Sequence, residues 1–219
     1  MSLNTVSALD ALTDALRSRI LNGDFDPDEH LVEKSLADQY AVARHTLRIA
    51  LQALESEGLL RREPRRGVFV ASVEPEDVLD IFRARVALEL EAVHVIVSRK
   101  LSLDAVREAC RHLQAIPRDA SWTEVINRDF AFHHALVHAA ASPRLARTYA
   151  SLQAETRLAM VRQKPLYATV TAVADEHGPI FDAVARGAEK EACALLRHHI
   201  EHSGQQLAAF IESRRRDDR

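Results

Sequence analysis

Two short helical patterns joined by a tight connection constrain the fold of this chain more than any other feature of its sequence. The first covers residues 33–40, and the second runs from Arg44 to Glu57 after a three-residue link. Apolar side chains recur at helical spacing in the second pattern, at Leu47, Ala50, Leu51 and Leu54. This order predicts a helix-turn-helix, in which the second helix has one buried face and one face turned to solvent.

A small hairpin is predicted directly after these helices. Gly58 can end the second helix, and residues 59–62 and 67–70 have the composition of two short strands. The turn between them, residues 63–66, carries arginine side chains into solvent. A charged turn is often only a solvated loop, but its position just behind an exposed helix favours a wing that contacts DNA phosphates.

The exposed side of the second helix carries polar and basic side chains near its N-terminal end. An arginine at such a position can bind guanine O6 and N7 as a fork in the major groove. Arginines in the turn would instead add contacts to phosphates that do not depend on base sequence. The residues expected to contact DNA are Arg44, His45, Thr46, Arg48, Arg65, Arg66 and Gly67.

Residues 8–71 resemble the winged helix-turn-helix half of the GntR family of bacterial transcription regulators. The resemblance is carried by Leu16, Ile20, Gly23, Leu31, Glu33, Leu36, Ala37, residues 43–51, Leu54, residues 57–59 and residues 65–70. In the family the reading helix usually opens with Ser-Arg-x-Pro-Val-Arg-Glu-Ala-Leu. This chain keeps both arginines, but it has Ala43, Thr46 and Ile49 where serine, proline and glutamate are usual. The resemblance implies binding to an operator, and these three departures predict that the operator sequence differs from those of relatives.

Composition argues against several other classes of protein. The 219 residues carry a net charge of −3, so any affinity for DNA must come from local placement of basic residues rather than from a generally basic chain. Cys110 and Cys193 lie far apart, which argues against a disulfide framework or a zinc finger and favours a reducing, cytoplasmic compartment. We find no signal peptide and no long apolar run, so we expect neither secretion nor a membrane partner.

Strand patterns stop at a short linker, residues 72–74, and the rest of the chain has helical periodicity. Six helices are predicted, at about residues 75–99, 102–115, 121–141, 143–163, 169–186 and 188–213. They would form an all-helical bundle of about 140 residues, a fold that commonly binds ligands between its helices. The predicted fold is therefore mainly α, with a winged helix-turn-helix and a small β-hairpin wing at 8–71 and an all-α bundle at 75–213.

The 121–141 helix carries titratable residues on its apolar face. On a helical wheel Asp129 and His133 fall in the middle of the apolar arc, whereas His134 and His138 fall on the opposite, polar face. A carboxylate and an imidazole at the centre of a buried face require partners, because an unpaired buried carboxylate is costly.

The last two helices also turn an imidazole toward the core, because His177 and His199 lie among apolar residues on their wheels. A single inward histidine is usually a satisfied core residue, but three of them with a carboxylate suggest a shared metal ion. Three imidazoles and one carboxylate suit Zn²⁺, Ni²⁺ or another first-row divalent ion better than Mg²⁺ or Ca²⁺, which prefer oxygen ligands. We therefore expect one divalent transition metal ion per chain, most simply Zn²⁺ or Ni²⁺.

Residues 75–213 resemble the FCD sensor domain of FadR-like GntR regulators, in its six-helix, VanR-type form. The resemblance is carried by Phe82-x-x-Arg85-x-x-x-Glu89, Asp129-x-x-Phe132-His133-x-x-Leu136, Ser142-Pro143-Arg144-Leu145, Glu176-His177-x-x-Ile180 and Ala192-x-x-x-Leu196-x-x-His199-Ile200. The metal pattern of the family is complete as Asp129, His133, His177 and His199. The resemblance implies that these residues hold the ion and that a small organic acid binds to it as the effector.

Arg85 and Glu89 are the residues expected to bind the effector beside the metal. They share an inward stripe of the 75–99 helix and are spaced for an intrahelical ion pair. Two interpretations stay open. The pair is purely structural, or Arg85 binds a second polar group of the acid.

These expectations describe a homodimeric regulator, not an enzyme, that binds a palindromic double-stranded DNA operator and responds to a small organic acid. Repression relieved by the acid is the default. One alternative is a metalloenzyme, because open positions on a histidine-bound cation also suit hydrolysis, although no obvious general base accompanies the four residues. Another is a constitutive DNA-binding protein whose metal is only structural. Release of DNA that depends on a ligand would distinguish the sensor from the second alternative.

Overall fold

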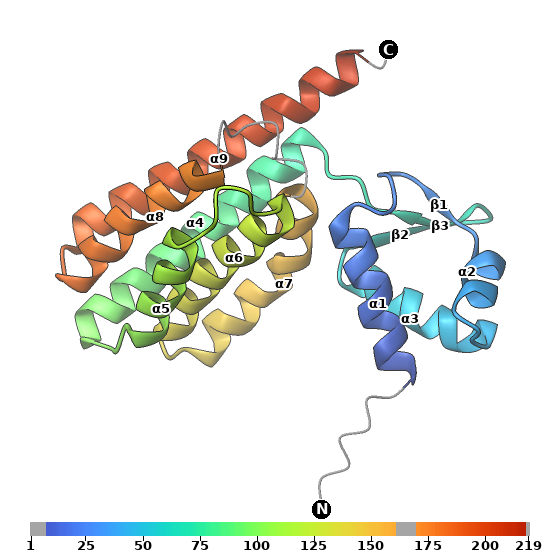
Figure 1. Ribbon diagram of the computed structural model, residues 1–219, viewed down its shortest axis with the longest axis horizontal. Helices are drawn as coiled ribbons and strands as arrows, with labels where there is room; N and C mark the ends of the chain where they lie inside the picture. Colours follow the sequence, from blue (N-terminus) through green and yellow to red (C-terminus); the bar gives the residue numbers. More distant parts are fainter. Residues whose placement is uncertain (1–7, 161–169, 218–219) are drawn as a thin grey trace, which may run out of the picture. The chain divides into compact units, whose positions relative to one another are not determined.

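The computed structural model describes residues 8–160 and 170–217, and Figure 1 shows its mainly helical fold with one small sheet. The chain divides into two compact units, one ending at Val73 and the other beginning at Glu74. This confirms the predicted fold class. In the described ranges no helix is both long enough and apolar enough to span a membrane.

The first unit combines three helices with a three-stranded antiparallel sheet in the order β1-β3-β2. Its elements are α1 (Ala8–Asn22), β1 (His30–Leu31), α2 (Glu33–Gln39), α3 (Arg44–Ser56), β2 (Leu60–Glu63) and β3 (Gly67–Val70). The sequence predicted only the β2–β3 hairpin. Strand β1 adds the third strand, with Leu31 opposite Val68, and it is too short for any periodicity to reveal it.

The position of α3 is set by its buried face and by one ion pair. The largest fully buried side chains in the described part of this unit are Leu16, Ile20, Leu47, Leu51, Leu54 and Leu59. Arg17 on α1 donates from Nε and Nη2 to the two carboxylate oxygens of Glu57, both at 2.7 Å, just after α3 ends. Because this pairing is bidentate, it is a geometrically specific link between α1 and the end of α3.

The hairpin turn requires unusual backbone angles at two positions. Arg65 has a φ of 66° and Gly67 a φ of 107°. A Cβ atom at Gly67 would lie 2.5 Å from Nε2 of His30, so only glycine fits there without displacing that side chain. The turn holds Arg65 and Arg66 in exposed positions at the end of the sheet.

The described residues of the second unit form a bundle of six helices. Its helices are α4 (Pro75–Arg99), α5 (Asp104–Gln114), α6 (Trp122–Ala139), α7 (Pro143–Met160), α8 (Val170–Ala185) and α9 (Glu189–Asp217). The predicted helices match these within about two residues at most ends, as is usual for helix boundaries. The exception is α9, which continues past the predicted end at residue 213. Residues 161–163 and 169 of the predicted helices lie outside the described residues.

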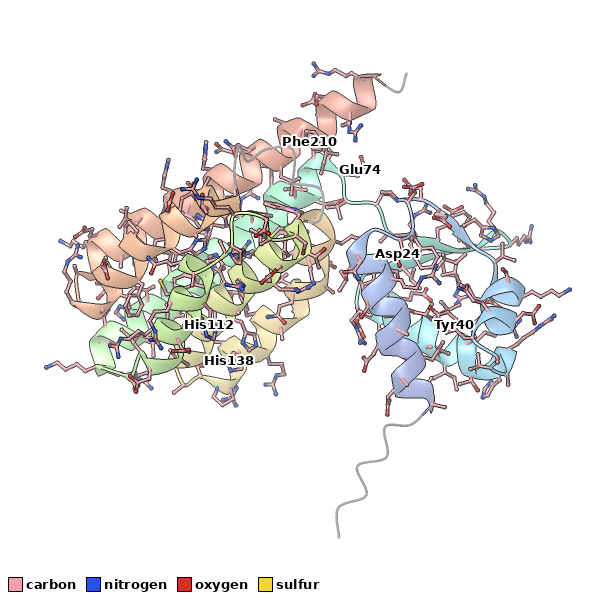
Figure 2. The ribbon with its side chains drawn as sticks, in the orientation of Figure 1. Asp24, Tyr40, Glu74, His112, His138 and Phe210 are labelled. Carbon is pink, nitrogen blue, oxygen red and sulfur yellow. The ribbon has the colours of Figure 1, made fainter. Side chains whose placement is uncertain are left out.

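Caps in the sequence mark where two of these helices begin. Glu74 and Asp77 form a capping box at the start of α4, where Figure 2 labels Glu74, and Pro75 occupies the first turn. Ser121 Oγ accepts a hydrogen bond from the backbone N–H of Glu124 at the start of α6.

The long helices α4 and α9 run side by side, and α4 also packs against α6 and α7 (Figure 1). Gly204 allows α9 to approach α4 closely, because a Cβ atom at this position would lie 2.8 Å from Cγ of Phe82. Fully buried side chains of the bundle include Ile96, Leu113, Phe132, Leu136, Ile180 and Leu196. This core surrounds a small group of buried polar residues.

Candidate metal centre and DNA-binding surface

Four buried residues from three helices converge in the interior of the bundle. Asp129 and His133 come from α6, His177 from α8 and His199 from α9. One ligand atom from each lies within 4.8 Å of the others. On α6 the spacing of four residues places the carboxylate and the imidazole one turn apart on the same buried face. The structure therefore brings together the four residues that the sequence singled out.

The inner nitrogens of the three imidazoles face one another. His133 Nε2 lies 3.2 Å from His177 Nε2 and 3.3 Å from His199 Nε2. The fourth group is close as well, since Oδ1 of Asp129 lies 3.1 Å from His177 Nε2. Nitrogens bound tetrahedrally at the usual Zn–N distance of about 2.0–2.1 Å lie about 3.3 Å apart. The spacing of the imidazoles thus fits a shared ion of this size.

The outer nitrogen of each imidazole, Nδ1, lies beside a hydrogen-bond acceptor. The pairs are His133 with Glu89 Oε2 at 2.6 Å, His177 with the Val173 carbonyl at 2.7 Å, and His199 with Glu176 Oε2 at 2.6 Å. A carbonyl or a carboxylate can only accept, so the proton of each neutral imidazole is placed on Nδ1. The lone pairs of the three Nε2 atoms then point to a common centre, as metal-binding histidines require.

Charge and burial at this centre favour a bound cation. Burial, together with the neighbouring His177, lowers the pKa of His199 to about 4, so its imidazole is neutral at pH 7 and its lone pair is available. Burial would raise the pKa of Asp129, but the imidazoles outweigh it and lower that pKa. Among the described residues, Oδ2 of Asp129 is buried without a hydrogen-bond partner. An ionised oxygen left in this state is costly unless a cation binds it.

The fully buried carboxylate of Glu89 on α4 connects His133 of the centre with Tyr149 on α7 and with Arg85 on α4. Besides the bond from His133, it accepts a hydrogen bond from Tyr149 Oη at 2.9 Å and one from Arg85 Nε at 3.1 Å. Burial alone would raise the pKa of Glu89, but the charges of His133 and Arg85 and these hydrogen bonds lower it to about 2. The carboxylate of Glu89 is therefore ionised at pH 7.

A small cavity adjoins two of the four residues, Asp129 and His199. It has a volume of about 10 Å³, room for about one water molecule, and Arg85, Asp129, His199, Trp122 and Met160 are among the residues that line it. The side chain of Arg85 forms the intrahelical pair with Glu89 and also lines this cavity. Its contact with an acid stays a prediction. Glu89 itself does not line the cavity.

The wheel for α6 also separates the remaining histidines of that helix. His134 and His138 lie on its exposed face, with ring centroids 4.0 Å apart, and Figure 2 labels His138 there. They take no part in the buried group. Sequence reasoning did not find Tyr149 or the hydrogen-bonding role of Glu176. Glu176 could have been found from its place next to His177, whereas nothing in the sequence singles out Tyr149.

The predicted DNA-contacting residues lie on exposed parts of the first unit. Arg44, His45 and Arg48 are exposed on α3, with Thr46 half-buried between them. Gly67 is half-buried at the start of β3, beside the exposed arginines of the hairpin turn. Arg44 and Arg65 form no ion pair with any residue in the ranges that the structure describes, whereas Arg66 pairs with Glu63. Free guanidinium groups at the start of a helix and on a wing are suited to phosphates and base edges.

Comparison with known proteins identifies both units. Residues 9–70 match the gntR family of bacterial regulatory proteins, and residues 80–202, more than half of the chain, match the FCD domain. The chain belongs to the GntR family. This GntR protein has an FCD domain, as the resemblance in its sequence implied, and the FadR-like subfamily fits.

Curated relatives align with this GntR protein over most of their length. It is 31% identical over 212 residues to the HTH-type transcriptional repressor GlaR of Escherichia coli K12. This alignment covers 90% of this chain and 93% of GlaR. It is 27% identical over 217 residues to the HTH-type transcriptional regulator LutR of Bacillus subtilis, covering 88% of this chain and 98% of LutR. The protein is thus a DNA-binding transcription regulator with an effector-binding domain, and not an enzyme.

A solved structure has the same fold as this GntR protein. It is a GntR transcriptional regulator from Rhodococcus sp. RHA1, which superposes with a TM-score of 0.81 at 27% identity and covers 92% of this chain and 97% of its own.

Proposed function

We propose that this regulator binds one divalent transition metal ion per chain, Zn²⁺ or Ni²⁺, through Asp129, His133, His177 and His199. The observation that carries the proposal is the meeting of three Nε2 atoms whose Nδ1 atoms are all hydrogen-bonded outward. The unpartnered oxygen of Asp129 supports it. The ion would supply a positive charge that holds an acidic ligand in the bundle.

The effector that fits this charge pattern is a small organic acid, such as a sugar acid, a hydroxy acid or a dicarboxylate. One carboxylate would bind to the ion, and the guanidinium of Arg85 would hold a second polar group, since it lines the same cavity as Asp129 and His199. The cavity holds about one water molecule, so the acid can bind only if the lining side chains move. The acid would therefore contact the bundle differently in the moved and the unmoved arrangements of these side chains. This difference is how binding would shift the conformation of the bundle.

The regulated output is binding to DNA. A homodimer would present two α3 helices to a palindromic operator in the cytoplasm, and the acid would change the stability of the DNA-binding arrangement and so release a repressor. GlaR is named a repressor, which favours repression over activation for this protein. The alternative in which the metal is purely structural predicts no response to any acid.

The experiment is a panel of small carboxylates tested on metal-loaded and metal-free protein. An effector should raise the melting temperature only of the metal-loaded protein, and it should change the affinity for the operator. By linkage, operator DNA must then change the affinity for the acid by the same factor. An acid that binds equally well with and without DNA would be an occupant of the cavity and not the effector.

Two adjacent histidines provide a matched pair for this experiment. His133→Ala should abolish metal binding and the response to the acid, whereas His134→Ala, on the exposed face of the same helix, should keep both. Metal content measured by elemental analysis tests this directly. Loss of metal in His134→Ala but not in His133→Ala would refute the assignment of the ligands.

A further inference from the structure

Glu33, the first residue of α2, lies between two arginines of the DNA-binding unit. Its Oε2 accepts a hydrogen bond from Arg48 Nε on α3 at 2.8 Å, and its Oε1 lies 3.8 Å from Nη1 of Arg62 on β2. Arg62 is held in turn by Glu55, whose Oε2 lies 3.2 Å from Arg62 Nε. The carboxylate thus joins the two helices of the helix-turn-helix to the sheet.

The bond from Arg48 uses one particular part of the guanidinium group. Because Nε is the donor to Glu33, the outer edge formed by Nη1 and Nη2 is left for another acceptor, and 62% of the side chain of Arg48 is exposed. The two N–H groups of this edge can donate in parallel to guanine O6 and N7. Arg44, near the same end of α3, has no comparable support from any residue that the structure describes.

We propose that Glu33 is a positioning residue that holds the Nη edge of Arg48 toward a base in the major groove. The inference rests on the expected base contact of Arg48. A long arginine side chain loses rotamer freedom when it binds a base, and a prior bond at Nε removes part of that freedom before DNA arrives. The charge of Arg62, 3.8 Å from the other oxygen of Glu33, also attracts the carboxylate toward this position.

The negative charge of Glu33 makes the positioning role testable. Repulsion of DNA by this charge and positioning of Arg48 predict opposite effects when Glu33 is removed. A carboxylate close to DNA repels phosphates, so removing it should by electrostatics alone strengthen binding to every DNA sequence. If Glu33 positions Arg48, removing it should instead weaken binding to the preferred sequence relative to other sequences.

The experiment measures the affinity of the full chain for two DNA duplexes at one salt concentration. One is a duplex selected by the wild-type protein from a random library, and the other is a scrambled duplex of the same composition. Glu33→Ala should lower the ratio of the two affinities by at least about fivefold, because a bidentate base contact discriminates against the wrong base by about this factor or more. Glu33→Gln should give a ratio between those of Glu33→Ala and wild type.

Asp38→Ala is the matched control. It removes the same charge from an exposed position on the same helix and should leave the ratio unchanged. The inference is overturned if Glu33→Ala behaves like Asp38→Ala. Melting temperatures of both variants identify any loss of DNA affinity that comes from unfolding of the unit. If Glu33→Ala is unstable, the affinity ratio is measured with Glu33→Gln, which keeps an oxygen acceptor.

A double-mutant cycle shows whether Glu33 acts through Arg48. In the Arg48→Ala background, Glu33→Ala should cause no further loss in the affinity ratio, and a second, equal loss would contradict the positioning role. If Arg48→Ala alone leaves the ratio unchanged, the base contact itself is refuted. Arg65→Ala marks the other kind of contact, since it should weaken binding to both duplexes alike and flatten the dependence on salt.

Discussion

At the scale of single residues, two carboxylates, those of Glu89 and Glu176, accept hydrogen bonds from imidazoles of the candidate metal centre. Glu89 is fully buried and accepts hydrogen bonds from an arginine, a tyrosine and a histidine. The carboxylate of Glu176 is 41% exposed and, among the described residues, accepts a hydrogen bond only from His199. A hydrogen-bonded carboxylate behind a metal-binding imidazole orients the ring and increases its basicity. The two carboxylates therefore support the same centre, Glu89 from the buried interior and Glu176 from a position exposed to solvent.

We predict that Glu89→Gln weakens metal binding although Glu89 is not a ligand. The amide has no charge to balance Arg85 or to polarise His133, and loss of such a partner typically costs about 10–100-fold in metal affinity. The measurement is competition with a chromophoric chelator. Tyr149→Phe removes one hydrogen bond from the same carboxylate and leaves its charge, so its effect should be clearly smaller. Equal effects of the two variants would show that packing, and not charge, supports the site.

At the scale of secondary-structure elements, the close approach of α4 and α9 depends on a residue without a side chain. The atoms nearest to a Cβ at Gly204 are Cγ, Cβ and Cδ1 of Phe82, at 2.8–3.0 Å, and they lie near the backbone of α4. A rotation at the far end of the ring cannot make room for them. Helix packing around the metal centre is therefore tightly constrained on this side.

Gly204→Ala should reduce the free energy of unfolding of the bundle. Alanine favours the helix by up to about 1 kcal/mol. Overpacking against Phe82 costs about 1–3 kcal/mol, so the net effect is a loss. Urea unfolding of the metal-loaded protein measures it, and Gln205→Ala at the neighbouring exposed position should change stability by no more than about 0.5 kcal/mol. A stabilised Gly204→Ala protein would show that α9 moves away from α4 at little cost.

At the scale of the whole molecule, each of the two units has a buried core of its own. The residues of the candidate metal centre all belong to the second unit, and the exposed arginines of α3 and the wing belong to the first. Metal binding is linked to folding of the part of the chain that provides the ligands. We therefore expect the metal to stabilise the second unit, whereas the residues expected to contact DNA lie in the first.

Removal of the metal with a chelator should therefore act on one unit. Amide hydrogen exchange in α6, α8 and α9 should become faster by at least about tenfold, since a factor of ten corresponds to only about 1.4 kcal/mol of lost ligand stabilisation. Exchange in α1 and α3 should stay as it was. Mass spectrometry of peptic fragments measures both in one sample. A uniform acceleration along the chain would contradict separate stabilisation.

The sequence by itself determined the features that depend on local periodicity. A period of 3.6 residues places Asp129 and His133 on one buried face of α6 and His134 and His138 on the other, and the structure shows this separation. The same reasoning identified α2, α3 and the hairpin, because glycines and apolar spacing act within a few residues. The strand β1 was missed, since a pair of residues has no period.

Only the tertiary structure decided which side chains meet. His133 and His177 are separated by 44 residues and His133 and His199 by 66, and helical wheels give the face of each residue but not its height along the bundle. The support of His133 by Glu89 and that of Arg48 by Glu33 also join different helices. These contacts arise because packing of whole helices fixes the position of each side chain, and that packing is a property of all the buried surfaces together.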